Sequence, residues 1–531
     1  MAECSGWSVG HGMRPAGKKD RQRERKNQVG RKPQTAIRGV FSVAIINLLA
    51  RLIAYGKHIV ITAYIGLSAQ LDAFYIAVTV LSIVVFIFGD VFDSLGIPRL
   101  VKTLHEEGEE QFRLLAVSIL TFSMILSSLL CLFLFLIAPW TPWIAPGFSL
   151  ETKGFVLRNL YFLAPMAFLY LPYHAIGSFL RAKRRFLAFY IGELIIASTT
   201  FLILFVWHDV PYIIPISFSA AYLIIFAYIV AAGMREVRLG AGFGGEKMRG
   251  LVRMLFFLLP LYLTGHLFIL VDRIFASFLP TGGVSALSYG FMIAMIPCSI
   301  LMFDSIFITP LSEASDREPL MNDILKGVLI ISVPITVFTV AYANQIVEAA
   351  FERGVFTSSS TWMTGEALAY ISLALPAFFI WPICYRLFQI LEKLFAIGII
   401  SLCAVLLNAV LNFLFMKMGM GIKGLALATS ISWYALVANG AFIFRQFGLK
   451  IFSKDVWQVF FISLGIGVAA LGVTWLVPAG FGSFPVLILR GAAFLMTVAS
   501  LLFLVPHEAV KNWRDTIIRE IFPGKEPMVD T

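Results

Sequence analysis

One apolar segment near the N-terminus, "ARLIAYGKHIVITAYIGLSAQLDAFYIA" at residues 50–77, carries charged side chains far from either of its ends. Arg51 and His58 are seven residues apart, so on a helix they share a face, and Lys57 is displaced from them by about 100°. Guanidinium and ammonium groups are the usual binders of phosphate. These residues therefore predict a cationic wall for an anionic, phosphate-bearing ligand. The alternative is structural: an ion pair for Arg51 and a Lys57 side chain that reaches outward to water.

Three acidic residues follow this segment. Ionisable groups inside a membrane are costly, and they usually line a polar cavity or pair with one another. Asp72 opens the next apolar segment, where it is either a functional acid or a plain N-terminal cap of its own helix. Asp90 and Asp93 share a face near the far end of that segment. They are predicted to balance the charge of the cations across a lumen or to form a cytoplasmic gate.

Further polar residues interrupt apolar segments later in the chain. Asp272 and Arg273 are adjacent in "ILVDRIFASF", and Asn408 and Asn412 are one turn apart in "LLNAVLNFLF". Arg273 is predicted to act as a gating or charge partner. The remaining intramembrane charges are assigned structural roles, namely pairing for two acids and snorkelling for one arginine: Glu193, Asp304 and Arg490.

The composition predicts the elements that must position these residues. Of the 531 residues, 59% are hydrophobic and 14% are charged, and the mean hydropathy is +0.86. Apolar runs of about 20 residues are long enough to cross roughly 30 Å of hydrocarbon as helices. We expect an all-α polytopic membrane protein with about fourteen spans, near residues 40–66, 72–98, 114–138, 155–180, 186–207, 211–233, 250–280, 284–310, 325–343, 361–385, 394–416, 421–444, 456–477 and 483–505. Strand-length alternation is absent, which argues against a membrane barrel.

The basic residues predict the orientation of these spans. Most of the 42 Lys and Arg fall in the two termini and in alternate loops, such as "RAKRR" and "MREVRLGAGFGGEKMR". Basic loops stay in the cytoplasm, so both termini are expected there, and the net charge of +11 does not indicate nucleic-acid binding. The basic tail at 1–38 is interpreted as a topology anchor that touches anionic lipid. It is not a signal peptide, because the first apolar run comes too late and is too long.

The motifs of soluble enzymes are missing from the sequence. There is no P-loop, no G-x-S-x-G and no H-E-x-x-H. The five cysteines are scattered without a C-x-x-C pair, so neither a zinc site nor a disulfide framework is predicted. We expect a protein without enzymatic activity and without a cofactor.

Several stretches resemble the MviN/MurJ family, the lipid II flippases of the multidrug/oligosaccharidyl-lipid/polysaccharide exporter superfamily. Besides residues 50–98, with Arg51, Lys57 and "LDAFYIA", they are "DRIFASFLPTGGVSALSYG", "AAFERGVFTSSSTWMTGEAL" and "LNAVLNFLFMKMGMGIKGLALATSIS". The resemblance covers nearly everything after the N-terminal tail.

The resemblance implies two six-helix lobes related by pseudo-twofold symmetry around a central cavity, followed by two helices that form a groove for a lipid tail. The implied segments are a tail at 1–38, lobes at 39–233 and 250–446 joined by a cytoplasmic linker at 234–249, the extra helices at 455–506 and a cytoplasmic tail at 507–531. The lobes would rock between inward-open and outward-open states. The implied protein is a monomer in the bacterial inner membrane, with membrane lipids and a polyprenyl-pyrophosphate-linked glycan as partners.

The resemblance also implies residue roles. Arg51 and Lys57 match cations that receive the pyrophosphate, and Asp72 matches a functional acid. Some relatives hold a sodium ion between helices 7, 11 and 12, and oxygen donors that suit a hard cation stand at the matching positions: Asp272, Asn408, Asn412 and Thr429. The resemblance thus implies a coupling Na⁺ or H⁺ as the one exception to the expected absence of cofactors.

This chain departs from the family where lipid II transporters carry further charges. It has Val85 or Phe86 in place of an arginine midway along helix 2, and "YGFMIAMIP" without an Arg–Glu pair in helix 8. We therefore expect a flippase for lipid II or for a related exopolysaccharide or O-antigen unit. Two alternatives remain. One is a cation-coupled multidrug antiporter, which the acids Asp272 and Asp304 would support, and the other is a non-transporting scaffold.

Overall fold

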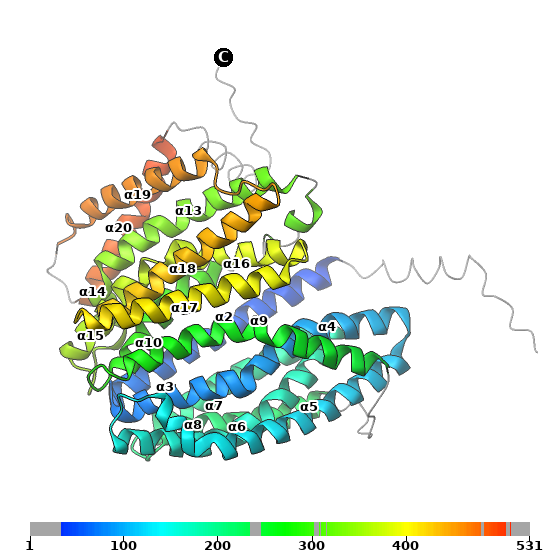
Figure 1. Ribbon diagram of the computed structural model, residues 1–531. Coiled ribbons are helices and arrows are strands. Elements are labelled where there is room, and N and C mark those ends of the chain that lie inside the picture. The colour runs from blue at the N-terminus through cyan, green and yellow to red at the C-terminus, as the bar shows by residue number, and fades with distance from the viewer. Residues whose placement is uncertain are drawn as a thin grey trace, which may run out of the picture.

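The computed structural model describes residues 33–233, 246–301, 307, 310–314, 316–478, 483–505 and 510. Every regular element in these residues is a helix. The helices lie side by side across the molecule, with the N-terminal half below and the C-terminal half above in the view of Figure 1. The expected all-α fold is confirmed.

The N-terminal half, called the N-lobe here, comprises seven α-helices with a π-helical turn and a 3₁₀ turn among them. In chain order the elements are α2 (Pro33–Tyr64), α3 (Ala69–Leu81), η1 (Ser82–Phe86), α4 (Ile87–Glu106), α5 (Glu109–Ile137), η2 (Ala138–Ile144), α6 (Leu150–Ala182), α7 (Phe186–Val206) and α8 (Ile213–Gly233). The π-helical turn η1 joins α3 and α4 into a single span.

The C-terminal half, called the C-lobe here, is built from shorter pieces. Its described helices are α9 (Glu246–Ala276), α10 (Gly283–Ala294), α11 (Ile296–Leu301), α13 (Arg317–Ala341), α14 (Ala343–Phe351), α15 (Ser358–Ser372), α16 (Leu375–Ile390), α17 (Leu394–Lys417) and α18 (Gly421–Gln446). Helices α15 and α16 form one span bent by 49°. Two further helices, α19 (Lys454–Thr474) and α20 (Ser483–Leu504), pack on α13 and α14.

The number of spans nearly matches the expectation of fourteen. Within the described residues, twelve helices are long and apolar enough to cross a membrane, and the bent pair α15–α16 makes thirteen. Helix α9, with 31 residues, lies where the remaining span at 250–280 is expected.

The two lobes repeat one pattern of helix packing, which supports the expected pseudo-symmetry. In the N-lobe α2 packs on α7, and α8 packs on both α7 and α6; in the C-lobe α9 packs on α17, and α18 packs on α17, α15 and α16. A hydrogen bond repeats as well. The hydroxyl of Ser219 on α8 donates to the carbonyl of Phe162 on α6 at 2.6 Å, and that of Ser430 on α18 donates to the carbonyl of Tyr370 on α15 at 2.6 Å. Internal repeats of this kind are typical of secondary transporters.

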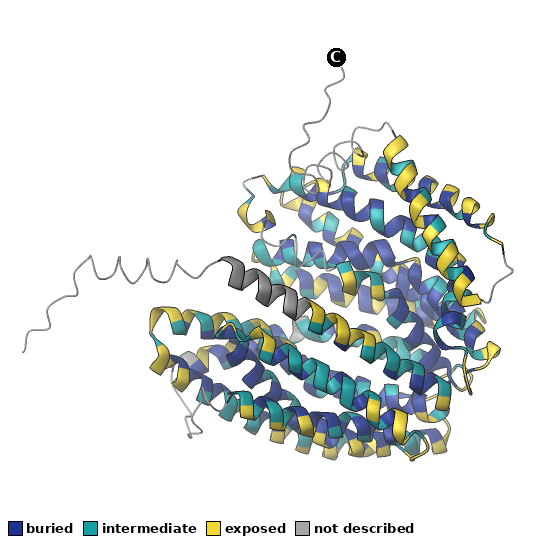
Figure 2. Ribbon diagram, turned by 180° about the vertical axis from the view of Figure 1, so that it is seen from behind, coloured by how far each residue is buried: buried dark blue, intermediate teal, exposed yellow. Residues whose placement is uncertain are grey.

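The surface fits an apolar surrounding. Large exposed apolar side chains cover the outward sides of the helices, including Leu129, Leu132 and Leu136 on α5, and buried residues lie between the helices (Figure 2). Exposed tryptophans stand near one end of the bundle, where α2 ends and α3 begins: Trp140, Trp143, Trp207, Trp362 and Trp475. Tryptophan is enriched at both membrane–water interfaces, and a further exposed one, Trp457, stands at the opposite end, in the first turn of α19. We call the end where α2 ends and α3 begins the outer end, a label that follows the orientation predicted from the basic loops.

Candidate functional site

The side chains of Arg51, Lys57 and His58 on α2 point in two directions. Arg51 is exposed, and it donates to the backbone carbonyl of Ser299 on α11 at 2.5 Å. The His58 ring meets Tyr289 of α10 edge-on, with centroids 5.8 Å apart. Arg51 and His58 thus face the same C-lobe span, as their seven-residue spacing predicts.

Lys57 turns the other way, into the N-lobe. Its side chain is buried, with 8% of the residue exposed, and its Nζ lies 4.6 Å from the ring centroid of Phe218 on α8. The alternative in which Lys57 reaches outward to water is therefore wrong. Among the described residues Arg51 bonds to a carbonyl oxygen and to no carboxylate. Asp304, an acid five residues beyond Ser299, lies outside those residues, so the alternative of an ion pair for Arg51 stays open.

Asp72 joins the two lobes at the outer end. Its carboxylate accepts hydrogen bonds from the backbone N–H groups of Gly282, at 2.7 Å, and Ser285, at 2.8 Å, and from the Ser285 hydroxyl. The interpretation of Asp72 as a cap of its own helix is wrong, because Ser68 caps α3 by accepting from the Leu71 N–H. Asp72 instead caps α10, where a negative charge at a helix N-terminus is favourable.

A second contact at the outer end joins the C-lobe to the last turn of α2. Within the "FERGVFT" stretch, the backbone N–H of Val355 donates to the carbonyl of Ala63 at 2.9 Å. Gly354 has a φ of +58°, and a Cβ there would collide with the same Ala63 carbonyl. Only glycine combines this backbone conformation with so close an approach. We call this contact and the Asp72 bonds the outer latch.

Aromatic side chains from both lobes fill the space beneath the outer latch. Tyr289 of α10 lies 5.0 Å from Phe351 of α14 and 6.0 Å from Tyr75 of α3, centroid to centroid. Tyr55 of α2 contacts Phe351 at 5.9 Å. The outer end is therefore closed in this structure.

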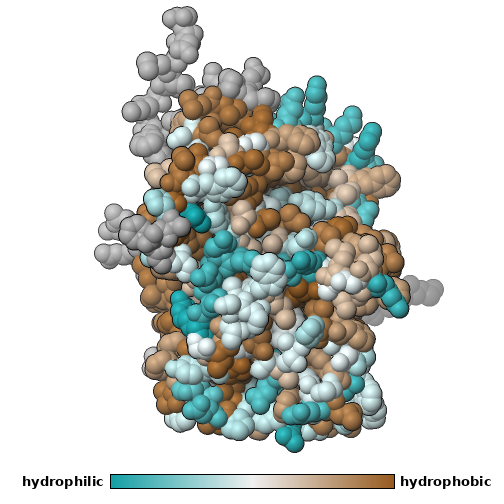
Figure 3. Space-filling view, turned by 90° about the vertical axis from the view of Figure 1, so that its left-hand side faces the viewer, coloured by the Kyte–Doolittle hydropathy of each residue, from teal (hydrophilic) through white to brown (hydrophobic). Residues whose placement is uncertain are grey.

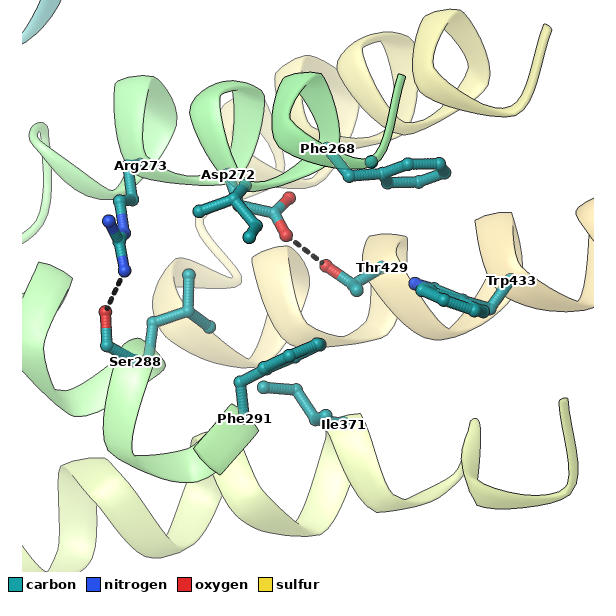
Figure 4. Close-up of a pocket in the computed structure, with 11 residues that line it drawn as sticks. Phe268, Asp272, Arg273, Ser288, Phe291, Ile371, Thr429 and Trp433 are labelled. Carbon is teal, nitrogen blue, oxygen red and sulfur yellow. Dashed lines mark hydrogen bonds between the residues drawn. The ribbon is translucent and has the colours of Figure 1, made fainter. Parts of the chain in front are cut away.

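Asp272 and Arg273 are adjacent on α9 but point apart (Figure 4). The Arg273 guanidinium donates to the Tyr75 carbonyl at 2.6 Å and to the Thr79 hydroxyl at 2.5 Å, both on α3. Arg273 thus links the C-lobe to the N-lobe through neutral oxygens.

The structure brings the four predicted cation ligands together inside the C-lobe. One Asp272 carboxylate oxygen accepts from the amides of Asn408, at 2.7 Å, and Asn412, at 2.9 Å, and the other accepts from the Thr429 hydroxyl at 2.8 Å. Both asparagines are completely buried. Rotation of either amide by 180° would present its oxygen in place of its nitrogen, so these donors fit a hard cation such as Na⁺.

A cavity of about 190 Å³ adjoins this group. Asp272, Arg273 and Thr429 line it together with apolar side chains, among them Phe291 and Trp433 (Figure 4). Water or a small ion could therefore reach Asp272 from within the C-lobe.

Asp90 and Asp93 belong to two separate contacts. The Asp90 carboxylate lies 3.4 Å from Nε2 of His266 on α9, so it meets the opposite lobe, as a gate would. Asp93 accepts from Arg181 at 2.5 Å and lies 3.1 Å from Nδ1 of His174, both on α6. Asp93 therefore does not balance the charge of the cations of α2, because it already interacts with Arg181 and His174 of its own lobe.

The residues assigned structural roles are placed as follows. Glu193 accepts from the Tyr173 hydroxyl at 2.7 Å, so it is paired as expected. The Arg490 guanidinium lies over the ring of Tyr342, the residue that follows the last turn of α13, at 5.4 Å; its snorkelling stays a prediction. Asp304 lies outside the described residues.

Where the resemblance leads one to expect an arginine, the chain has a local change of helix. Val85 is completely buried, and Phe86 stacks on Tyr170 at 4.5 Å. Both residues belong to the π-helical turn η1. Such turns are frequent at functional sites of helices.

Comparisons with known proteins agree with this arrangement. The family model described as "Lipid II flippase MurJ" matches residues 61–489. A probable lipid II flippase MurJ of Synechocystis is 25% identical over 419 residues, which cover 73% of this chain and 77% of that protein. Another of Rickettsia prowazekii is 29% identical over 179 residues, covering 32% of this chain and 35% of that protein.

Solved structures show the same fold. A structure described as lipid II flippase MurJ in an inward closed conformation has a TM-score of 0.76 at 20% identity, and the match covers 90% of this chain and 99% of that one. An inward-facing transporter of the MATE family has a TM-score of 0.63 at 13% identity, covering 78% of this chain and all of that one.

Proposed function

The chain belongs to the MurJ family of lipid II flippases, and we propose that it carries lipid II, an undecaprenyl-pyrophosphate-linked glycan precursor of the cell wall, from the inner to the outer leaflet. The match over residues 61–489 supports this cargo. The likeness to the MATE transporter concerns the fold alone, at 13% identity. Neither an exopolysaccharide unit nor a drug is favoured by the comparisons.

The observation that carries the proposal is the state of Lys57. Its ammonium group is buried within the spanning region, and among the described residues no carboxylate forms a salt bridge with it; only the Phe218 ring approaches its charge. A lone cation at such a depth costs about 3 kcal/mol on insertion scales, and such residues usually mark a transport path. A diphosphate would supply the missing negative charge.

Arg51 supplies a second cation on the same helix. It lies six residues before Lys57, which places the two about 9 Å apart along the helix axis. A neutral carbonyl is its present partner, so a phosphate oxygen could replace that bond with a stronger, charge-assisted one. The substrate's headgroup would therefore be held first at Arg51 and then at Lys57 as it moves outward.

Transport would proceed by alternating access of the two lobes. The outer latch and the aromatic side chains beneath it close the outer end in this structure. The cycle would open these contacts and then re-form them. The Asp90–His266 contact between the lobes is formed together with the outer latch in this structure, and it would have to break when the other end opens. The basic loops support an orientation with both termini in the cytoplasm, in the bacterial inner membrane, with a monomer sufficient for the cycle.

We assign the cluster around Asp272 to a coupling cation, with Na⁺ the best fit. Asp272, Asn408, Asn412 and Thr429 would hold the ion through a carboxylate, two amide oxygens and a hydroxyl. Sodium would supply the positive charge that the buried carboxylate lacks, because Arg273 turns away from it.

Complementation of a strain depleted of its lipid II flippase tests the proposal. The wild-type chain should restore growth, and Arg51→Ala with Lys57→Ala should abolish the rescue at equal expression. Lys326→Ala is the matched control, since Lys326 is a cation on the spanning helix α13 that is paired with Asp323 at 2.9 Å. Full rescue by the double alanine variant would remove the role of the two cations. Failure of the wild-type chain would instead refute lipid II as the cargo.

A further inference from the structure

A second cavity, of about 540 Å³, opens at the outer end of the N-lobe. The first turns of α3 and α6, the last turn of α2 and the loop between α7 and α8 surround it, and its polar and aromatic lining includes Tyr64, Gln70, Glu151, His208, Asp209 and Tyr212. Figure 3 shows the end of the molecule on which this cavity lies, with hydrophilic side chains gathered between apolar ones. The volume lies within the range of small-molecule sites. We call this cavity the outer pocket.

The wall of the outer pocket offers an aromatic face. Tyr64 stacks on His208 with ring centroids 3.7 Å apart, and 48% of Tyr64 is still exposed. On the other side, the Arg158 guanidinium donates to the hydroxyl of Tyr212 at 2.9 Å and holds that ring in place. Rings that are fixed in advance lose little conformational freedom when a ligand stacks on them.

The rim of the outer pocket carries acceptors of hydrogen bonds. Glu151 and Asp209 contribute carboxylates, and the Asp209 side chain is 95% exposed, with His208 as its neighbour at 3.5 Å. Gln70 adds an amide. Carboxylates repel a phosphate, so the pocket does not suit the diphosphate itself. A sugar ring, with an apolar C–H face and a rim of hydroxyl donors, matches an aromatic wall edged by acceptors.

The outer pocket continues the path marked by Lys57. Tyr64 follows Lys57 by seven residues, so the two share a face of α2 and lie about 10 Å apart along it. The same holds on α8, where Ile214 lines the pocket one turn before Phe218, the residue that Lys57 contacts. A diphosphate near Lys57 would therefore have its attached sugars directed at the outer pocket.

We propose that the outer pocket binds sugar residues of the glycan headgroup as the substrate leaves on the outer side. This inference rests on the proposed function, since it takes the cargo to be a lipid-linked glycan. The pocket then gives the sugars a site in the N-lobe while the diphosphate is still near Lys57.

Binding of N,N′-diacetylchitobiose, a soluble pair of N-acetylglucosamine units, to the full chain in detergent tests the inference. Saturation-transfer NMR should show binding at millimolar concentrations, and Tyr64→Ala should weaken it about tenfold, as expected for the loss of one aromatic contact. Trp207→Ala is the matched control: Trp207 is an aromatic residue of the same loop as His208, is 55% exposed and does not line the pocket.

The inference is overturned if the wild-type chain shows no saturation transfer, if Tyr64→Ala binds as tightly as the wild type, or if Trp207→Ala weakens binding to the same extent. Thermal unfolding of each variant verifies that it is folded; should Tyr64→Ala unfold, Tyr64→Leu replaces it under the same criteria. Complementation by the wild-type chain is read separately. Rescue of growth without chitobiose binding would refute sugar binding at the outer pocket and leave the proposed transport of lipid II unaffected.

Discussion

Substitution of Asp72 by asparagine should loosen the outer end while the rest of the fold stays intact. The carboxylate is 2% exposed, and it accepts from two backbone N–H groups and one hydroxyl at the start of α10. Asparagine has nearly the same shape, but it has one acceptor oxygen in place of two and no charge. The substitution therefore removes the latch with the least disturbance of packing.

The size of the effect follows from these bonds. A hydrogen bond to a charged group contributes about 1.5–3 kcal/mol, and a charge at a helix N-terminus adds roughly 0.3–1 kcal/mol. Asparagine keeps one of the bonds in a weaker, neutral form, so we expect the closed outer end to lose about 2–4 kcal/mol. Since every 1.4 kcal/mol is tenfold, the ratio of open to closed outer ends should rise roughly 30- to 700-fold.

Distances between spin labels measure this ratio directly. In a background without the five native cysteines, labels at positions 207 and 362 report on the two lobes, because Trp207 and Trp362 are exposed at the outer ends of each. Asp72→Asn should shift the distribution to longer distances. Asp209→Asn, which removes an exposed carboxylate at the same end, should leave it unchanged. An unaltered distribution in Asp72→Asn would refute the latch.

Three further outcomes are expected. Gly354→Ala should lower the thermal stability and lengthen the same label distances, because its Cβ would collide with the Ala63 carbonyl. Gly419→Ala is the control: Gly419 also has a positive φ, but open space surrounds it, so the substitution should cost only the backbone strain of roughly 1–2 kcal/mol. Arg181→Ala should cost about 1–3 kcal/mol of unfolding free energy, since it removes the arginine from the largely buried Asp93 carboxylate and leaves only His174 as an ionisable partner. Arg113→Ala, in an exposed pair, should cost under 1 kcal/mol; equal losses would contradict the assignment. Sodium but not potassium should raise the melting temperature of the wild type, and Asp272→Asn should abolish that response.

The sequence is enough to predict the helices and part of the candidate site. Apolar runs of span length predict most helices because a helix satisfies its backbone hydrogen bonds within its own segment, as a span in hydrocarbon must unless it belongs to a closed barrel. The face shared by Arg51 and His58 follows from helical periodicity alone, and both do turn toward one C-lobe span. The grouping of Asp272 with Asn408, Asn412 and Thr429 came from the family resemblance, since spacing along one helix says nothing about three separate helices.

Contacts between the lobes lay beyond what the sequence could reveal. Asp72 looked like a cap because it stands in the first turn of α3, yet its partners are more than 200 residues away. His266, which meets Asp90, was overlooked because a single histidine in an apolar helix carries no spacing signal. The glycine in "FERGVFT" was the available clue to the second contact, since a glycine between apolar and charged residues often marks a close approach of two backbones.

The repeated packing of the lobes sets Lys57 and Asp272 in comparable surroundings with opposite charge. Ser219 and Ser430 make the same bond in the two lobes, and the residue before each, Phe218 or Thr429, is the one that meets the charged side chain. The N-lobe thus holds a fixed cation where the C-lobe holds a fixed anion. An anionic headgroup would neutralise the first and a metal cation the second, so each ligand removes a buried charge from its own lobe. Because an uncompensated buried charge is costly in either lobe, binding of both ligands would ease the movement of the lobes through an apolar surrounding. Coupling between substrate and cation would then need no direct contact between them.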